Sequence, residues 1–381
     1  MFCKAPFSSI EISALGEIYL CCPATLNISI GNIYKSPFEE IWYSDKAKQI
    51  RREILKNNYQ YCNLKICDPI NNIMQKKFSK FDNFIVNFAE NPPYPLYVKY
   101  CHDLHCNIKC ITCRDEFIIN NTQQTIELDT KIEKLLTCLK NCKIVSMNGT
   151  GEALASKHGH HLIKAINKNF PHIYFEFHTN GVLCNKKLLE KLGILDKVIS
   201  VNISMHASTK KTYEKIMLGS NYSKVLENLK FLAELKKAGQ LKALDLYFVV
   251  HKINYKEMKD FVNFAQKYSA DVYFWEYRKW ANKWGEENYN KVAIYEKSHY
   301  LYNDFAKILQ DPIFQQKNCH LNKFLLSIKP ISRFEHIKNI IIKDFKNSFF
   351  KIQTKYEKNQ KYKIITILGI KIKFKRHSKS I

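Results

Sequence analysis

The chain has 381 residues, of which 46% are hydrophobic, and it carries a formal net charge of +25 at pH 7. This length accommodates one large domain and a smaller one, and the hydrophobic content is sufficient for a packed core. No run of eighteen apolar residues is present to span a bilayer, and the first residues lack the apolar segment of a secretory signal, so we expect a cytoplasmic protein.

Cysteines are concentrated in the first part of the chain. Ten of the thirteen cysteines lie before residue 140. In a cytoplasmic chain this usage favours metal or redox chemistry over disulfides. The proline-rich stretch 91–95 then separates a cysteine-bearing segment of about ninety residues from the rest, because clustered prolines interrupt both helices and sheet ladders.

After residue 95, short runs rich in β-branched and aromatic residues alternate with helical patterns. The predicted strands are 96–100, 143–148, 173–178, 198–205, 243–250 and 271–276. The predicted helices are 125–139, 162–169, 186–192, 222–238 and 255–268. Six strands separated by helices predict an α/β fold with a parallel sheet, open or partly closed into a barrel. Reactive groups of such folds lie on loops at the carboxyl ends of the strands.

Three cysteines, Cys106, Cys110 and Cys113, follow the first predicted strand within a run of eight residues. Three closely spaced thiolates suit an iron–sulfur cube in which one iron has no protein ligand and is open to a cofactor. A structural zinc site is the competing interpretation, but it takes four protein ligands in paired Cys-x-x-Cys units, which this spacing fits poorly. Cys101, five residues upstream, is interpreted as a thiol at the end of a strand.

The loops after the next three strands also carry polar residues and glycines. The candidate binding residues in the first of these loops are Gly149, Gly151 and Glu152. Glycines let a backbone approach a ligand closely, and a carboxylate is able to pair with an ammonium group. The alternative for 149–152 is an ordinary turn between a strand and a helix.

The end of the chain is strongly basic. Residues 321–381 contain sixteen lysines and arginines against three acidic residues, a net charge of +13 that is half of the total excess. Within it, 361–376 alternates apolar and basic residues after Gly369, which predicts a hairpin or an edge strand with a basic face. The alternative is a solvated charged tail, in a chain that favours lysine throughout.

The run 106–113 resembles the cluster-binding loop of the radical S-adenosylmethionine (SAM) enzymes. The resemblance implies a partial (β/α)6 TIM-like barrel in which the three cysteines hold a [4Fe–4S] cluster, whose open iron binds the amino and carboxylate groups of SAM. It implies reductive cleavage of SAM and removal of a hydrogen atom from a substrate. Thr112 departs from the family pattern, in which this position is usually aromatic.

The later loops are similar to further patterns of this family. The positions that the resemblance assigns to SAM are Gly149, Gly151, Glu152, Asn180 and Ser204. Glu152 would contact the amino group of SAM, Asn180 lies in a Thr-Asn-Gly turn, and Ser204 stands near the expected ribose. His206 occupies a position where aspartate is commoner, and we interpret it as a buried, hydrogen-bonded histidine.

The amino-terminal segment resembles the SPASM-type iron–sulfur module that accompanies many of these enzymes. The implied ligands of one auxiliary [4Fe–4S] cluster are Cys3, Cys21, Cys62 and Cys67, with Cys22 as an alternative to Cys21. Two features depart from the pattern: the module usually follows the radical SAM domain, and its full version has cysteines for two clusters. A zinc knuckle built from the same cysteines is the alternative. The predicted division is 1–90 for this module, 95–300 for the radical SAM core and 301–381 for a basic extension.

We therefore expect an enzyme that receives electrons from a flavodoxin or ferredoxin, acidic proteins that a basic surface suits. The expected substrate is a cell-surface glycan or nucleotide-sugar precursor, because the tail resembles the carboxyl ends of some bacterial surface-polysaccharide glycosyltransferases. The same tail predicts peripheral contact with the inner face of the membrane. A ribosomally made peptide is the rival substrate, since SPASM-bearing enzymes often modify peptides.

The alternative outside enzymes is a zinc-containing basic protein that binds nucleic acid. It would explain the charge but not residues 151–152 or the strand–helix alternation. The basic residues also concentrate far from the cysteines. We therefore expect no nucleic acid as a partner.

Overall fold

The computed structural model describes residues 3–64, 67, 87–147, 150–278, 286–357, 360–367 and 370–375. The chain divides into two compact units. Unit 1 contains Met1–Lys283 and Pro312–Ser327, and unit 2 contains Trp284–Asp311 and Ile328–Ile381. The predicted boundaries at residues 90, 95 and 300 remain predictions.

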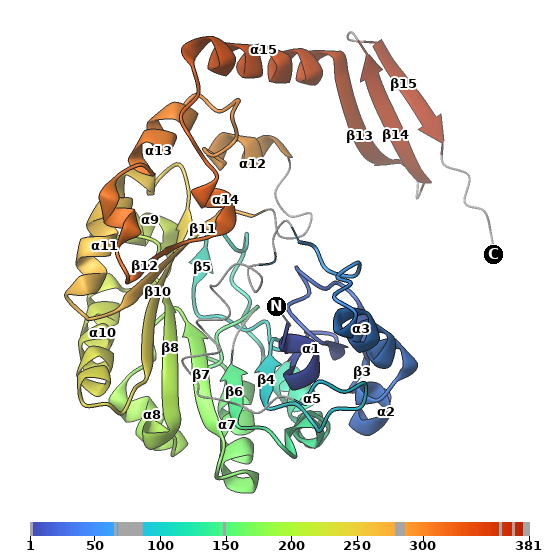
Figure 1. Ribbon diagram of the computed structural model, residues 1–381, viewed down its shortest axis with the longest axis vertical. Coiled ribbons are helices and arrows are strands. Elements are labelled where there is room, and N and C mark those ends of the chain that lie inside the picture. Colours follow the sequence, from blue (N-terminus) through green and yellow to red (C-terminus); the bar gives the residue numbers. More distant parts are fainter. Residues whose placement is uncertain are drawn as a thin grey trace. The chain divides into compact units, whose positions relative to one another are not determined.

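The centre of unit 1 is a parallel sheet (Figure 1). Its parallel strands, in sequence order, are β4 (Tyr97–Tyr100), β6 (Ile144–Met147), β7 (Tyr174–Thr179), β8 (Val198–Ser204), β10 (Ala243–Val250), β11 (Asp271–Glu276) and β12 (Cys319–Leu321). The mixed α/β fold with a parallel sheet is confirmed. All six predicted strands are present within one residue of their predicted bounds. The three-residue strand β12 was not predicted, because so short a run is not long enough to show an alternation of apolar and polar residues.

The amino-terminal strands extend this same sheet. They are β1 (Ser9–Ile12), β2 (Glu17–Tyr19) and β3 (Ser29–Asn32), accompanied by α1 (Ala5–Ser8), α2 (Phe38–Trp42) and α3 (Asp45–Leu55). β1 pairs in parallel with β4, and β2 pairs antiparallel with β1. Ile10 and Ile12 of β1 are buried. The module thereby covers an edge of the barrel sheet that would otherwise expose unpaired backbone groups.

Helices follow the strands of unit 1. They are α5 (Thr122–Asp129), α6 (Ile132–Leu136), α7 (Lys157–Asn169), α8 (Lys186–Leu192), α9 (Lys210–Ile216), α10 (Tyr222–Lys237), α11 (Met258–Gln266) and α14 (Lys323–Leu326), with short 3-10 turns at Thr137–Leu139, Leu195–Lys197, Tyr255–Glu257 and Pro312–Gln315. The prediction of a single helix over 125–139 is wrong. The helix ends at Asp129, and the hydroxyl of Thr130 donates to the Glu127 carbonyl oxygen at 2.8 Å. Such a side-chain bond to the backbone competes with helix continuation, and no Gly or Pro marks the break.

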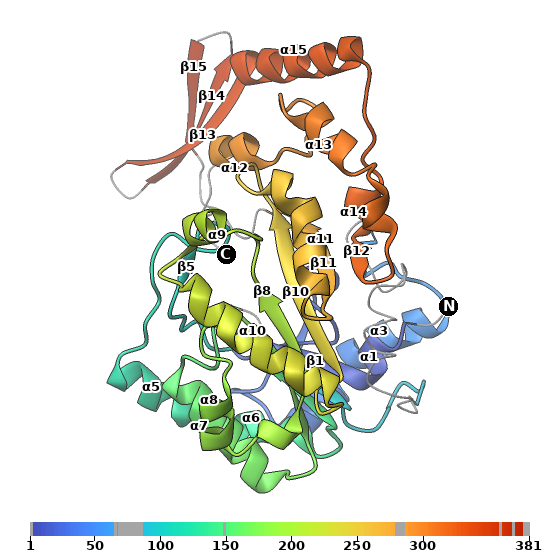
Figure 2. The same ribbon diagram turned by 90° about the vertical axis from the view of Figure 1, so that its left-hand side faces the viewer.

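The two faces of the sheet differ in character. One face carries large apolar side chains such as Phe177, Ile203 and Phe248, which are fully or almost fully buried. Figure 2 shows α10 and α11 lying over the strands β8, β10 and β11 on one side. The other, polar face includes Glu176, Ser200, Asn202 and Asp245, because Glu176 pairs with Ser200 and Asn202 with Asp245 across neighbouring strands.

Unit 2 combines helices with a small antiparallel sheet. Its elements are α12 (Glu286–Val292), α13 (Tyr302–Ile308), α15 (Arg333–Phe349), β13 (Phe350–Glu357), β14 (Gln360–Ile367) and β15 (Ile370–Lys375). β14 pairs with both β13 and β15. The hairpin predicted within 361–376 is therefore confirmed. Among the helices of the described residues, none combines the length and apolar character that crossing a bilayer requires.

Candidate cofactor site

The three predicted cluster ligands lie on the loop that follows β4, residues 101–114, which we name the cluster loop. Backbone hydrogen bonds hold it in place: Cys106 N–H donates to the Ile118 carbonyl oxygen at 2.8 Å, and Ile111 N–H donates to that of Ile216 at 3.0 Å. In addition, β5 (Lys109–Cys110) pairs with β9 (Met217–Leu218). The loop is thus fixed on both sides of Cys110 by segments that arrive from elsewhere in the chain.

The three thiols of the cluster loop lie close to one another. Burial raises the pKa of the Cys110 thiol, and the neighbouring Cys113 and Cys106 raise it further, while Arg114 opposes the rise. Burial also raises the pKa of the Cys106 thiol. Buried thiols with raised pKa values are costly to ionise without a cation, whereas a metal stabilises the thiolate directly. This donor set fits an iron–sulfur cluster.

No disulfide links any of the thirteen cysteines, all of which are described. Within the described ranges, no three His, Cys, Asp or Glu side chains gather tightly enough to hold a single metal ion. A cube distributes its three thiolates over three different irons. Its ligands therefore need a wider spacing than the ligands of one ion.

The Gly151–Glu152 turn packs directly against the cluster loop. A Cβ atom at Gly151 would lie 2.3 Å from the Asp103 carbonyl oxygen and 2.6 Å from that of His105, so only glycine fits. Glu152 N–H donates to the His105 carbonyl oxygen at 2.6 Å. The predicted binding residue Gly149 lies outside the described residues.

Arg114, the residue after Cys113, links the same two loops. Its guanidinium donates to the Leu104 carbonyl oxygen at 3.0 Å and also to the Thr150 carbonyl oxygen. The side chain is buried. Sequence analysis missed this role, although its position directly after the third cysteine was a usable signal.

The Glu152 carboxylate is buried and connects two strand ends. It accepts hydrogen bonds from Thr179 Oγ1 at 2.9 Å and from Asn180 N–H at 2.7 Å. Burial raises the pKa of Glu152 to about 7, although these hydrogen bonds lower it in part. Leu154 N–H is a third donor, at 3.4 Å, and no cationic side chain of the described residues is recorded in an ion pair with this carboxylate. A buried carboxylate of this kind suits an incoming ammonium group.

Asn180 continues this network to the cluster loop. Its side-chain N–H donates to Asn107 Oδ1 at 2.8 Å, and the same nitrogen lies 4.0 Å from Cys106 Sγ. The structure therefore brings together Glu152, Asn180 and a cluster-loop cysteine. Asn107 was not identified from the sequence.

Ser204 lies at the end of β8 on the polar face. Its hydroxyl shares a hydrogen bond of 2.9 Å with His178 Nε2, and the described contacts do not join it to Glu152. His206 is buried with φ 61°, and its Nδ1 accepts from Val249 N–H at 3.1 Å. Burial lowers the pKa of His206 to about 4. These observations agree with the prediction of a buried, hydrogen-bonded histidine.

The amino-terminal cysteines form a second group of thiols. Burial raises the pKa of Cys21, with further contributions from the neighbouring thiols Cys3, Cys22 and Cys67. Burial and the nearby Cys3 raise the pKa of Cys62 to about 11. The structure thus brings together the four predicted ligands Cys3, Cys21, Cys62 and Cys67.

The backbone explains how these distant cysteines meet. Asn63 N–H donates to the Thr25 carbonyl oxygen at 2.7 Å, and Cys67 N–H donates to that of Asn63 at 3.0 Å. The segment with Cys62 and Cys67 is thereby tied to the turn that follows Cys21. Cys22 lies near Cys21 and also near Cys101 and Lys99, and the choice between Cys21 and Cys22 as the ligand stays a prediction.

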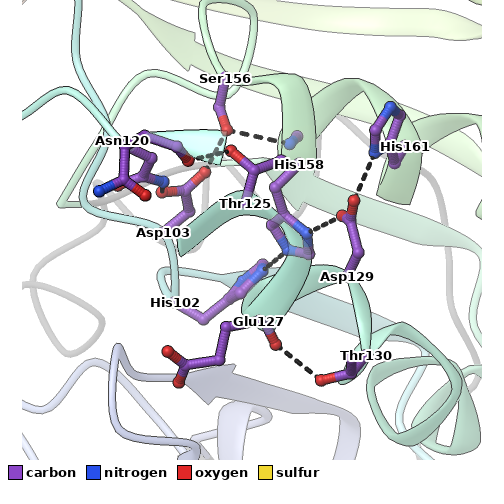
Figure 3. Close-up of polar contacts among 12 residues, drawn as sticks. His102, Asp103, Asn120, Thr125, Glu127, Asp129, Thr130, Ser156, His158 and His161 are labelled. Carbon is purple, nitrogen blue, oxygen red and sulfur yellow. Dashed lines mark hydrogen bonds and ion pairs between the residues drawn. The ribbon is translucent and has the colours of Figure 1, made fainter. Parts of the chain in front are cut away.

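A row of histidines, which sequence analysis missed, supports the start of the cluster loop (Figure 3). His102 Nε2 lies 2.7 Å from His158 Nε2, and Asp129 binds both His158 and His161, each at 2.7 Å. Burial and the nearby His158 lower the pKa of His102 to about 3, so that this ring stays neutral. Three histidines at 158, 160 and 161, just before the predicted helix 162–169, were the available signal.

Asp103 is anchored beside this row. Its carboxylate accepts from His105 N–H at 2.9 Å, from Asn120 at 3.0 Å and from the Ser156 hydroxyl, as Figure 3 shows in part. A cavity of about 20 Å³ lies next to His102, Asp103 and Gly151. It has room for one water molecule. The row and the Asp103 contacts fix the cluster loop to α5 and α7.

Comparison with protein families agrees with this geometry. Residues 102–265 match the model of the radical SAM superfamily, and residues 3–68 match the SPASM model, described as an iron–sulfur cluster-binding domain. The first match contains the cluster loop and the Glu152 group, and the second contains the amino-terminal thiols.

Two curated relatives are the FeMo cofactor biosynthesis proteins NifB of Methanocaldococcus jannaschii and Methanocaldococcus infernus. The first is 27% identical over 184 residues, which cover 41% of this chain and 61% of the relative. The second is 24% identical over 201 residues, which cover 47% of this chain and 64% of the relative. The chain thus spans less than two thirds of each relative's length. A similar solved structure is Streptococcus suis SuiB bound to S-adenosylmethionine, with 18% identity, a TM-score of 0.40, and coverage of 78% of this chain and 66% of that one.

Radical SAM enzymes use a [4Fe–4S] cluster and SAM, and the SPASM match adds a further iron–sulfur site. The three-cysteine loop, the Glu152–Asn180 network and both family matches lead to the same assignment. The chain carries a radical SAM domain at residues 102–265, preceded by an amino-terminal SPASM-like iron–sulfur module at residues 3–68.

Proposed function

We propose that this protein reductively cleaves SAM and removes a hydrogen atom from a polar, hydroxyl-rich substrate. The observation that carries the proposal is the continuous contact from Glu152 through Asn180 to Cys106. It supports the proposal because a buried carboxylate that would pair with an ammonium group shares a hydrogen-bond network with a thiol that would bind iron.

The proposed roles follow from the contacts of each residue. Cys106, Cys110 and Cys113 would hold the [4Fe–4S] cluster, and Glu152 would pair with the ammonium group of SAM. When bound, the cluster and SAM supply a one-electron reduction that ends in homolytic cleavage of a substrate C–H bond. Asn180 orients Glu152 through its backbone N–H, and Arg114 holds the two loops at a fixed separation.

We propose an auxiliary [4Fe–4S] cluster at Cys3, Cys21, Cys62 and Cys67. A cluster of four thiols, in which burial raises the pKa of Cys21, suits iron as a ligand partner. The family description of this segment, an iron–sulfur cluster-binding domain, supports an iron–sulfur site over a zinc site. This site would accept the electron that a substrate radical loses when it is oxidised. A flavodoxin or ferredoxin is the proposed donor for the first cluster.

The polar face of the sheet supports a glycan or nucleotide-sugar precursor as substrate. Asn202 is fully buried, and neither side-chain atom has a hydrogen-bond partner among the described residues; the same holds for the Ser200 hydroxyl. Buried amides and hydroxyls without partners are costly unless a ligand or water satisfies them. Sugar hydroxyls both donate and accept, and they match this combination of groups. A peptide is the rival substrate.

The test is anaerobic reconstitution of the Cys110→Ala variant. We expect it to release no deoxyadenosine from SAM under reduction, and to lose about four of about eight irons per chain, since each cube holds four. Cys142→Ala, which removes a buried thiol outside both groups, is the matched control and should retain both properties. Normal deoxyadenosine release by Cys110→Ala would refute the assigned ligands.

The substrate class is tested by hydrogen transfer. Deuterated nucleotide sugars and deuterated peptides are incubated separately with the reduced enzyme and SAM. We expect deuterium in deoxyadenosine from a nucleotide sugar, and we expect Asn202→Leu to abolish this transfer while unproductive SAM cleavage persists. Transfer from peptides alone would establish the rival substrate. The peripheral membrane contact indicated by the basic tail is proposed for unit 2.

A further inference from the structure

Helix α15 (Arg333–Phe349) of unit 2 exposes its apolar side. The exposed positions of its first three turns are Arg333, Phe334, Ile337, Lys338, Ile341 and Ile342. These positions recur with the helical period, so they form one continuous stripe along the helix. Four of the six are large apolar residues with exposed fractions of 80%, 47%, 60% and 41% for Phe334, Ile337, Ile341 and Ile342. A surface helix of a monomeric protein normally turns this stripe inward.

Two polar residues of α15 outside this stripe contact other residues of unit 2. Glu335 forms an ion pair with Lys297 at 3.3 Å, and His336 Nε2 lies 2.9 Å from the His299 carbonyl oxygen. Both contacts lie within unit 2. The orientation of the helix is therefore fixed by specific polar contacts.

The beginning of the helix is also well anchored. Ser332 Oγ accepts from Glu335 N–H at 3.1 Å, which is an N-cap interaction. Immediately before it, Ile331 N–H donates to Asn303 Oδ1 at 2.9 Å, and the Tyr302 hydroxyl donates to the Lys329 carbonyl oxygen at 3.0 Å. These contacts fix the start of the helix within unit 2.

Charge identifies the kind of surface that this stripe fits. Its two charged members, Arg333 and Lys338, are both cations, and no acidic residue lies in the stripe. Residues 321–381 as a whole carry a net charge of +13. Exposed Phe and Ile flanked by Lys and Arg are typical of helices that lie in the plane of an anionic bilayer surface.

We propose that the stripe formed by Arg333, Phe334, Ile337, Lys338, Ile341 and Ile342 docks this protein onto an anionic membrane surface. The apolar side chains enter the boundary between headgroups and acyl chains, while the two cations contact lipid phosphates. This contact does not depend on the cofactors or on the proposed reaction.

The experiment is sedimentation of the full-length protein with lipid vesicles. We expect binding to vesicles of phosphatidylglycerol and phosphatidylcholine in equal parts, weak binding to phosphatidylcholine alone, and release by high salt. The double variant Phe334→Ser/Ile341→Ser should reduce the partition coefficient by a factor of about 100 or more, because each side chain loses its transfer out of water. Arg333→Gln/Lys338→Gln should weaken binding to the anionic vesicles by about tenfold or more.

Ile126→Ser is the matched control, because Ile126 is a 52% exposed isoleucine on helix α5 of unit 1. It should bind like the unchanged protein. Unaltered vesicle binding by Phe334→Ser/Ile341→Ser, which keeps every tail lysine, would overturn the proposal. A second outcome would also overturn it: no vesicle binding, with dimers of the unchanged protein in light scattering that Phe334→Ser/Ile341→Ser abolishes. The stripe would then join two copies of the chain.

Discussion

At the scale of single residues, Glu152 is buried, whereas its proposed pairing with an ammonium group requires an ionised carboxylate. The pKa of its carboxyl is raised to about 7 by burial, above the ordinary value of 4.5. Near neutral pH a large fraction of the protein therefore carries a protonated Glu152. A bound ammonium group favours the ionised form, so the proposed binding of SAM at Glu152 would release this proton.

We predict that the affinity for SAM falls as the pH drops below about 7, approaching a tenfold loss per pH unit, because protonated Glu152 cannot pair with an ammonium group. Titration calorimetry in buffers of different ionisation enthalpy would measure both the affinity and the proton released. Glu152→Gln should bind SAM about ten to a hundred times more weakly at neutral pH and lose this pH dependence. An unchanged pH profile in Glu152→Gln would exclude Glu152 as the titrating group.

The cysteines could be proposed from residue type and spacing, and Glu152 from the resemblance of its loop to the family pattern; their roles stay predictions. It did not identify Asn107, Arg114 or the His102–His158 contact. These residues act through hydrogen bonds that form only when β4, β6 and β7 place their loops side by side. Such contacts depend on the tertiary arrangement, and no local pattern encodes them.

At the scale of secondary structure elements, the strands were predictable and one helix was not. Runs such as 243–250 are long and apolar on one face, so the spacing of their apolar residues identifies them as strands. The break between α5 and α6 follows Asp129, whose carboxylate binds two histidines of α7, and it coincides with the bond from the Thr130 hydroxyl to the Glu127 carbonyl oxygen. The pairing of β1 with β4 was also hidden, because it joins residues about ninety positions apart.

The helices of the amino-terminal module are joined by one buried cation. Arg51 of α3 is fully buried and donates to the carbonyl oxygens of Pro6, Trp42 and Glu90 at 2.9, 2.8 and 3.2 Å. Its guanidinium also lies 4.0 Å from the centre of the Trp42 ring. The planar fork of arginine reaches several carbonyl oxygens at once, which the single ammonium group of lysine does not.

We predict that Arg51→Lys lowers the free energy of unfolding by about 2–4 kcal/mol, because it leaves buried carbonyl oxygens without donors. Urea unfolding of the metal-free protein would measure the change. The neighbouring Arg52 is the control: it is 51% exposed and pairs with Glu90 at 2.8 Å. Arg52→Lys should change stability by less than about 1 kcal/mol. Equal effects of the two substitutions would show that Arg51 does not join the helices.

At the scale of the whole molecule, charge is the dominant global property. The net charge is +25, of which residues 321–381 contribute +13 and the residues before 321 contribute +12. An acidic electron donor is therefore attracted over distances longer than any single contact. Attraction of this kind raises the rate of encounter and weakens as salt screens it.

We predict that reduction of the cluster by an acidic flavodoxin slows by about tenfold or more when the salt concentration rises from about 0.05 M to about 0.5 M. Stopped-flow absorbance of the reconstituted enzyme would measure the rate constant. A neutral small-molecule reductant is the control, because its encounter rate does not depend on protein charge and should remain nearly constant.

The variant Lys371→Gln/Lys373→Gln/Lys375→Gln removes three positive charges from β15 in unit 2. Because the cluster loop belongs to unit 1 with its own positive excess, we expect this variant to keep most of the salt dependence. A flavodoxin rate that is independent of salt in the unchanged protein would show that charge does not guide the donor.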